Sequence, residues 1–130
     1  MNKQPTHIID ISQLQGAPDN FSGTVFVQSV ASAENGPTIV ACVTFEKGAH
    51  TFWHKHGGEQ VLYFLEGKGR VEIEGQGKID ANPGDIVRIP PNTRHWHGAH
   101  PDEPTRMRHL AITNNGVTWL EEVSEEVYRK

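Results

Sequence analysis

Short segments with the residue pattern of β-strands recur along the chain, each bounded by a cluster of turn-forming residues. The segments are rich in β-branched and aromatic residues and often alternate apolar with polar positions, as in half-buried strands. The turn clusters contain Gly, Pro, Asn and Asp, for example at residues 66–69 and 82–85. Many short strands at close spacing are typical of a sandwich or barrel. The predicted strands are residues 24–30, 38–45, 51–55, 61–65, 70–74, 85–89 and 107–113.

Two further elements are predicted near the ends of the sequence. Residues 121–129 favour a short helix, because Val123 and Val127 are four apart and Ser124 precedes two glutamates. Residues 7–11 are apolar enough for an added strand, which a dimer could exchange between its subunits. The fold class predicted from the whole pattern is all-β with a short C-terminal helix.

Composition narrows the class of protein further. A length of 130 residues suits one domain, residues 1–130, and 35% hydrophobic with 22% charged residues is typical of a soluble globular protein. No apolar run approaches the ~20 residues of a membrane span, and no secretory signal is evident, so we expect a cytoplasmic protein without a membrane partner. With a net charge of -4 and scattered basic residues, nucleic acid is not expected as a partner.

Cys42 is the only cysteine, which excludes an internal disulfide and a cysteine-based zinc site. Any metal must therefore be bound by imidazole and oxygen ligands. A cluster of histidines is available for this, since five of the eight lie in two short windows: His50, His54, His56, His95 and His97.

Strand geometry brings several of these side chains together. Alternating faces place His54 and His56 on the same side of a strand, roughly 7 Å apart along the chain. Gln60 follows after a turn, and His95 begins a segment that could run back beside both. For a lone histidine, a surface or hydrogen-bonded core position is the better default, and a His-x-His pair also recurs by chance. The residues around the pair decide between these readings.

The flanking spacing forms two motifs in a fixed order. The first runs from Gly48 through His54, His56 and Gln60 to Gly67, and the second runs from Gly84 through Pro90 to His95. This arrangement resembles the two-motif signature of the cupin superfamily. The resemblance implies a jelly-roll β-barrel whose metal-binding core spans about residues 38–113. It also implies one divalent metal ion, bound by His54, His56, Gln60 and His95.

Gln60 stands where most cupins have Glu. Three neutral imidazoles and an amide leave the ion its full +2 charge, which makes it a stronger Lewis acid and more resistant to oxidation. Four protein ligands leave about two open positions on an octahedral ion, which suits manganese, iron, cobalt or nickel better than a closed zinc site.

A closer resemblance, to the manganese-dependent bacterial hydroxynitrile lyase cupins, extends beyond the two motifs. It is carried by residues 21–25, 43–46, 51–54, 58–60, 95–99, 109–112 and 119–128. Gln60 in place of Glu belongs to that subgroup's pattern. The resemblance implies manganese as the metal and reversible cleavage of cyanohydrins to an aldehyde and cyanide as the reaction. It assigns Thr51, His97 and His109 to the reaction pocket.

Strand parity agrees with most of this assignment. His97 lies two residues past His95 and faces inward with it, and His109 shares its face with Ala111 and Thr113. Thr51 lies three residues before His54 and would point outward unless a bulge resets the alternation. We expect His50 at the rim of the site. The tryptophans are expected to be packing residues, with Trp53 and Trp96 facing away from the metal.

Three functions fit these residues. The first is a lyase in which the metal binds a substrate oxygen, His97 accepts the proton and His109 assists the carbon fragment that leaves or attacks. The others are a metal-dependent dioxygenase and a cupin that binds a small molecule without catalysis. His97 could instead orient a ligand, and His109 could be a satisfied core group. A small-molecule substrate and a homo-oligomer, dimer or tetramer, are expected.

Overall fold

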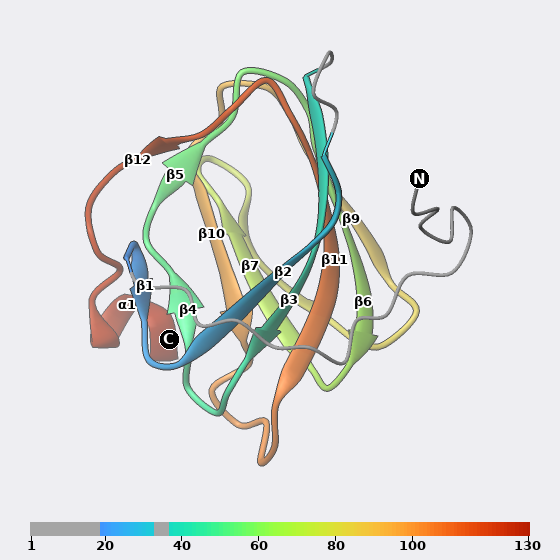
Figure 1. Ribbon diagram of the computed structural model, residues 1–130. Helices are drawn as coiled ribbons and strands as arrows, with labels where there is room; N and C mark the ends of the chain where they lie inside the picture. The colour runs from blue at the N-terminus through green and yellow to red at the C-terminus, as the bar shows by residue number, and fades with distance from the viewer. Residues whose placement is uncertain (1–18, 33–36) are drawn as a thin grey trace, which may run out of the picture.

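Two curled β-sheets face each other in the computed structural model, which describes residues 19–32 and 37–130 (Figure 1). The strand expected at residues 7–11 lies outside this described part. All the longer predicted strands are present, so the all-β prediction is confirmed.

The larger sheet has the order β1-β4-β10-β5-β12, with β7 added beside β10 and β8 beside β7. Two of its strands, β10 and β7, run antiparallel over five residue pairs, from His95↔Ile73 to Ala99↔Gly69. Its strands are β1 (Phe21–Ser22), β4 (His50–Thr51), β5 (His54–Lys55), β7 (Gly69–Ile73), β8 (Gly77–Ala81), β10 (His95–Ala99) and β12 (Thr118–Trp119).

The smaller sheet has the order β2-β3-β11-β6-β9. Its central strand β11 pairs with β3 along its whole length, and a register shift at Arg108/His109 interrupts its pairing with β6. Its strands are β2 (Val25–Ser32), β3 (Thr38–Phe45), β6 (Gln60–Glu66), β9 (Ile86–Ile89) and β11 (Met107–Asn114).

The main core lies between the two sheets. It is built from the alternate, inward-facing residues of the strands, as the pattern of hydrophobic positions predicts. Phe45, Phe64, Leu62 and Met107 are completely buried there. Burial of such large apolar side chains stabilises a barrel that does not depend on a metal for its core.

The segment predicted as one strand, residues 51–55, is broken in the structure. It forms two short strands, β4 and β5, separated by Phe52 and Trp53, whose backbone N–H groups bond to Asn20 and Glu121 instead. The alternation of inward and outward side chains is therefore reset between Thr51 and His54. This break changes which residues reach the interior.

The C-terminal helix is present but shorter than predicted. Helix α1 spans Glu125–Arg129, and the Ser124 hydroxyl caps it by accepting a hydrogen bond from the N–H of Val127. The first residues of the predicted helix extend along the sheet, because Trp53 exchanges backbone hydrogen bonds with Leu120 and Glu121. No helix of the described residues is long and apolar enough to cross a membrane.

A second, smaller apolar cluster joins α1 to the outer face of the larger sheet. Trp96 and Tyr128 are completely buried there and Val123 packs beside them, so Trp96 faces away from the site as predicted. His50 belongs to this side too, since its ring stacks on Tyr128 with centroids 4.1 Å apart. The expectation of a rim position for His50 is therefore wrong. Strands β4 and β10 approach closely here, because a Cβ at Gly98 would lie 2.4 Å from the His50 Cβ.

Candidate metal centre

Neighbouring strands bring the predicted ligands together at one end of the barrel. His54 on β5 lies opposite His95 on β10, and the centroids of their rings are 4.2 Å apart. The His56 ring lies 5.0 Å from that of His54 and 5.2 Å from that of His95. Gln60 begins β6 and is almost completely buried. Its amide oxygen Oε1 lies 3.0 Å from His95 Nε2, so the four predicted ligands form one cluster.

A backbone carbonyl orients each of the three imidazoles. His54 Nδ1 lies 2.8 Å from the Phe52 oxygen, His56 Nδ1 2.8 Å from the Gly116 oxygen, and His95 Nδ1 2.8 Å from the Thr93 oxygen. Because a carbonyl can only accept, each Nδ1 carries the proton and each Nε2 presents a lone pair. Metal-binding histidines are usually oriented in this way.

Burial keeps these imidazoles neutral near pH 7. It lowers the pKa of His95 to about 4, and burial together with the neighbouring His95 lowers the pKa of His54 well below its usual value. Burial also lowers the pKa of His56. Neutral imidazole is the form that binds a metal ion.

Two features show that these residues fit a cation. The Nε2 atom of His56 is buried without a hydrogen-bond partner among the described residues. In addition, the lone pair of His95 Nε2 faces Gln60 Oε1, which is also an acceptor, at 3.0 Å. Two acceptors repel each other at this distance unless they share a positive charge, and a neutral His95 does not supply one. A divalent ion bound by nitrogen and oxygen ligands would satisfy all of these atoms.

His97 also lies close to this cluster. Ligand atoms of His54, His95 and His97 are all within 4.8 Å of one another, so these three buried histidines can hold a metal ion. The sequence assigned His97 to the reaction pocket and His56 and Gln60 to the metal. The geometry therefore allows His97 either of two roles, as a metal ligand or as a pocket residue beside the ligands.

His97 and His109 form a buried pair. His97 Nδ1 lies 3.1 Å from His109 Nε2, and His97 Nε2 has no partner among the described residues. Burial, and then the charge of His109 and of His54, lowers the pKa of His97 well below its usual value, and burial lowers that of His109 to about 4. His109 packs against the rings of Phe45 and Phe64. It lies behind His97 and is not among the residues that line the cavity described next.

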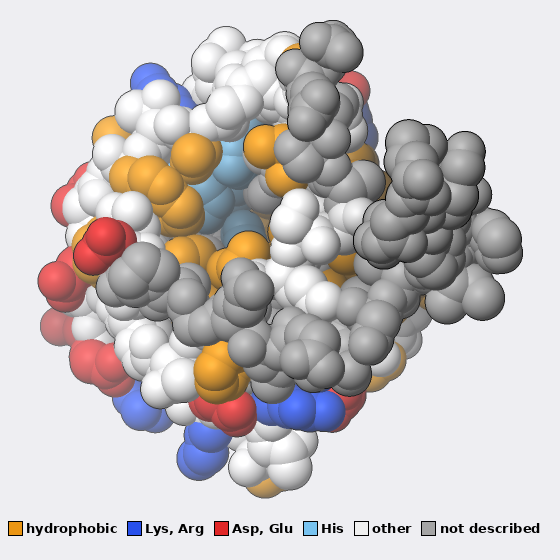
Figure 2. Space-filling view, viewed as in Figure 1, with side chains coloured by type: hydrophobic (Ala, Val, Ile, Leu, Met, Phe, Trp, Pro, Cys, Tyr) orange, Lys and Arg blue, Asp and Glu red, His pale blue; other side chains and the backbone are white. Residues whose placement is uncertain are grey.

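An apolar cavity of about 200 Å³ opens beside the histidines. Figure 2 shows the imidazoles at the floor of a hollow surrounded by hydrophobic side chains. The lining residues are Phe21, Val27, Ile39, Ala41, Val43, Thr51, His54, His56, Gln60, His97, Ala111, Thr113, Gly116, Val117 and Trp119. The apolar walls could enclose a small organic molecule with its polar group toward the histidines.

Two residues take positions that strand parity did not predict. Thr51 lines the cavity, and its hydroxyl accepts a 3.2 Å hydrogen bond from the N–H of His97. The break between β4 and β5 brings it inward, as a bulge would. Trp119, expected only to pack, also lines the cavity and lies with its ring centroid 4.7 Å from that of His54. The sequence carried no signal for this, because the position of Trp119 depends on the pairing of β12 with β5.

The fold and the histidine cluster define a small β-barrel with a candidate metal site, and the comparisons with known proteins identify its family. The Cupin domain family matches residues 41–113, so the chain belongs to the cupins. A cupin-like protein of Thermotoga maritima has the same fold, with a TM-score of 0.83 and 41% identity over 92% of this chain and 95% of that one.

Two enzymes are similar in sequence to different extents. The (R)-mandelonitrile lyase of Granulicella tundricola is 41% identical over 122 residues, which cover 89% of this chain and 91% of that protein. The acireductone dioxygenase of Alcanivorax borkumensis is 33% identical over 70 residues, which cover 52% of this chain and 38% of that protein. The similarity to the lyase therefore extends over nearly the whole chain, whereas the similarity to the dioxygenase is confined to part of it.

Proposed function

We propose that this cupin is a metal-dependent lyase that cleaves and forms cyanohydrins, with manganese as its metal. The observation that carries the proposal is the buried, unpartnered Nε2 atom of His97, a residue that lines the apolar cavity beside the candidate ligands. Such a neutral imidazole is suited to take a proton from a substrate hydroxyl. The similarity to a mandelonitrile lyase over nearly the whole chain supports the same reaction.

The protein's own groups can move the one proton that this reaction requires. His97 Nε2 takes the hydroxyl proton of the cyanohydrin, the oxygen forms the carbonyl double bond, and the bond to the nitrile carbon breaks. Cyanide leaves with that electron pair and then receives the proton from His97, so the products are an aldehyde and hydrogen cyanide. The divalent ion, when bound, supplies Lewis acidity toward the substrate oxygen.

His109 and Thr51 hold His97 for this step. For Nε2 to accept a proton, Nδ1 of His97 must carry one, and His109 Nε2 can accept a hydrogen bond from it at 3.1 Å. The Thr51 hydroxyl binds the His97 backbone at 3.2 Å. The apolar side chains of the cavity enclose the rest of the substrate and exclude water, which would otherwise compete for the proton.

Release of benzaldehyde from mandelonitrile by the manganese-loaded protein tests the proposal. We expect the wild-type protein to catalyse it and His97→Ala to lose roughly 10²-fold or more in turnover, the usual contribution of a general acid or base. His97→Ala should keep its metal, as measured by elemental analysis, and its melting temperature within a few degrees. His50→Phe is the matched control, because His50 is a buried histidine on the other side of the sheet and Phe can keep its stacking on Tyr128.

The other outcomes favour other functions. Loss of metal from His97→Ala would make His97 a ligand, as its distance to His54 and His95 allows. Oxygen uptake with catechols or flavonols, without benzaldehyde release, would favour a dioxygenase. Neither activity would favour a cupin that binds a small molecule. The homo-oligomer stays a prediction, which light scattering after size-exclusion chromatography can measure.

A further inference from the structure

The amide of Gln60 has two ends of nearly the same shape and opposite hydrogen-bonding character. Its Oε1 lies 3.0 Å from His95 Nε2, and its Nε2 donates to the Thr113 hydroxyl at 2.8 Å. Gln60 and Thr113 are register partners on the adjacent strands β6 and β11. Gln60 is almost completely buried, and the Thr113 hydroxyl is the hydrogen-bond partner of its amide nitrogen among the described residues.

Without the Thr113 hydroxyl, the orientation of this amide that places its NH₂ group toward the histidines would form the better hydrogen bonds. The imidazoles of His56 and His95 present lone pairs from Nε2, which the NH₂ end of Gln60 could satisfy if the amide turned over. That turned orientation would place two donors where a cation needs an acceptor. With the oxygen toward the cation, the NH₂ group needs another acceptor, and Thr113 Oγ1 is the one that the structure provides. An unpaired buried NH₂ group would oppose metal binding.

We propose that Thr113 is a positioning residue for the metal centre, which holds the Gln60 amide with its oxygen toward the ion. The role belongs to the hydroxyl group of Thr113 and not to its methyl group. This inference rests on the metal site of the proposed function and does not depend on the lyase reaction. It adds to the site a residue that strand parity placed on the inward face of β11 without assigning it a role.

Manganese titration of the metal-free protein, with calorimetry or a competing chelator, tests this role directly. We expect Thr113→Val, which keeps the shape and removes the hydroxyl, to bind Mn²⁺ about 10- to 100-fold more weakly, the usual effect of losing a group that orients a ligand. Thr113→Ser keeps the hydroxyl and should bind within a few-fold of the wild-type protein. If Thr113→Val does not fold, Thr113→Ser and Thr113→Ala can be compared instead, because these two variants differ by one hydroxyl group.

Thr44→Val provides the matched control. Thr44 is buried in the same sheet, and its hydroxyl accepts a hydrogen bond from Arg108 and not from a site residue. We expect this variant to bind Mn²⁺ as the wild-type protein does. Unchanged affinity in Thr113→Val would overturn the proposal, and so would equal losses in Thr113→Val and Thr44→Val. A wild-type protein that binds Mn²⁺ but releases no benzaldehyde would contradict the proposed function and leave this inference standing.

Discussion

Each candidate ligand is held by contacts that do not involve a metal, and this determines what its removal should do. His54 and His95 bond through Nδ1 to the carbonyls of Phe52 and Thr93, while the core between the sheets is formed by other, apolar residues. We therefore expect His54→Ala or His95→Ala to abolish metal binding and to leave the β-fold intact. Elemental analysis and far-ultraviolet circular dichroism measure the two effects. Full metal retention in both variants would contradict the ligand assignment.

The neutral amide at position 60 leads to a second prediction. A carboxylate there would attract a divalent ion more strongly but would reduce its residual charge from +2 to +1, which weakens its action as a Lewis acid. We expect Gln60→Glu to bind Mn²⁺ at least as tightly as the wild-type protein and to release benzaldehyde more slowly. Turnover equal to that of the wild-type protein would show that the ligand charge does not control the rate.

Individual residues were predictable where a motif fixes their spacing. His54, His56, Gln60 and His95 were identified from such a pattern, and the structure brings them together. His50 was misplaced because parity counted back from His54 turned it toward the site, and the break between β4 and β5 makes that count invalid. The break depends on hydrogen bonds from Phe52 and Trp53 to distant parts of the chain, which no local pattern records.

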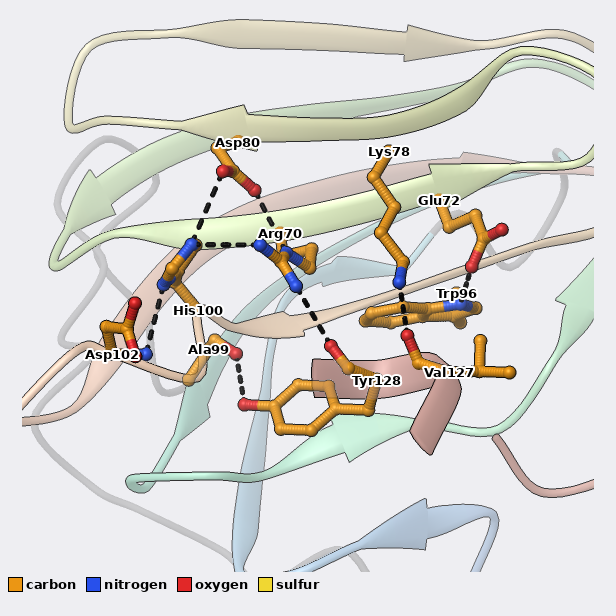
Figure 3. Close-up of polar contacts among 10 residues, drawn as sticks. All are labelled: Arg70, Glu72, Lys78, Asp80, Trp96, Ala99, His100, Asp102, Val127 and Tyr128. Carbon is orange, nitrogen blue, oxygen red and sulfur yellow. Dashed lines mark hydrogen bonds and ion pairs between the residues drawn. The ribbon is translucent and has the colours of Figure 1, made fainter. Parts of the chain in front are cut away.

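At the scale of elements, the C-terminal helix supports the outside of the strand that carries His95 and His97. Figure 3 shows that α1 is joined to β7 and β8 by polar contacts. Buried Arg70 donates to the Tyr128 carbonyl at 3.0 Å and to Asp80 at 3.0 Å, while the Tyr128 hydroxyl donates to the Ala99 carbonyl at 2.5 Å. Trp96, between two inward histidines on β10, packs beneath this helix.

Removal of Arg70 should therefore destabilise the fold. Arg70→Ala removes the donor to the buried Tyr128 carbonyl and leaves Asp80 with His100 as its remaining partner, and we expect a loss of about 1–3 kcal/mol in the free energy of unfolding. Lys130→Ala is the control, because Lys130 forms an exposed pair with Glu126 four residues away, which typically contributes ~0.5 kcal/mol or less. Urea unfolding measures both variants, and equal effects would argue against a special role for Arg70.

Whole strands and the helix were predicted correctly where a local sequence signal defines them, and were missed where a strand forms only through pairing with a distant segment. The alternating pattern identified β3 with its exact bounds of residues 38–45, and Ser124 marked the cap of α1. Strands β1, β8 and β12 were not predicted. The two-residue strands β1 and β12 exist through their pairing with β4 or β5, and β8 pairs with β7. Strand β12 carries Trp119 to the cavity, so the shape of the cavity could not be predicted from the sequence.

At the scale of the whole molecule, the barrel keeps several histidines neutral in its interior. Burial lowers the pKa of both His95 and His109 to about 4, and it lowers the pKa of His54 and His97 well below 6.5. In the unfolded chain these imidazoles regain an ordinary pKa near 6.5. The folded protein therefore binds fewer protons than the unfolded protein in the interval between these values.

This difference predicts the direction in which acid affects the metal-free protein. The unfolded state binds more protons than the folded state between pH 6.5 and about 4. The free energy of unfolding therefore has its full value above pH 6.5 and falls as the pH decreases through that interval. Each extra proton bound by the unfolded state contributes a slope of about 1.4 kcal/mol per pH unit. We expect urea unfolding of the chelator-treated protein to show this loss, with a shallower slope for His109→Phe, which removes one of the titrating groups. A free energy of unfolding that stays constant across the interval would mean that these imidazoles are not kept neutral by the fold.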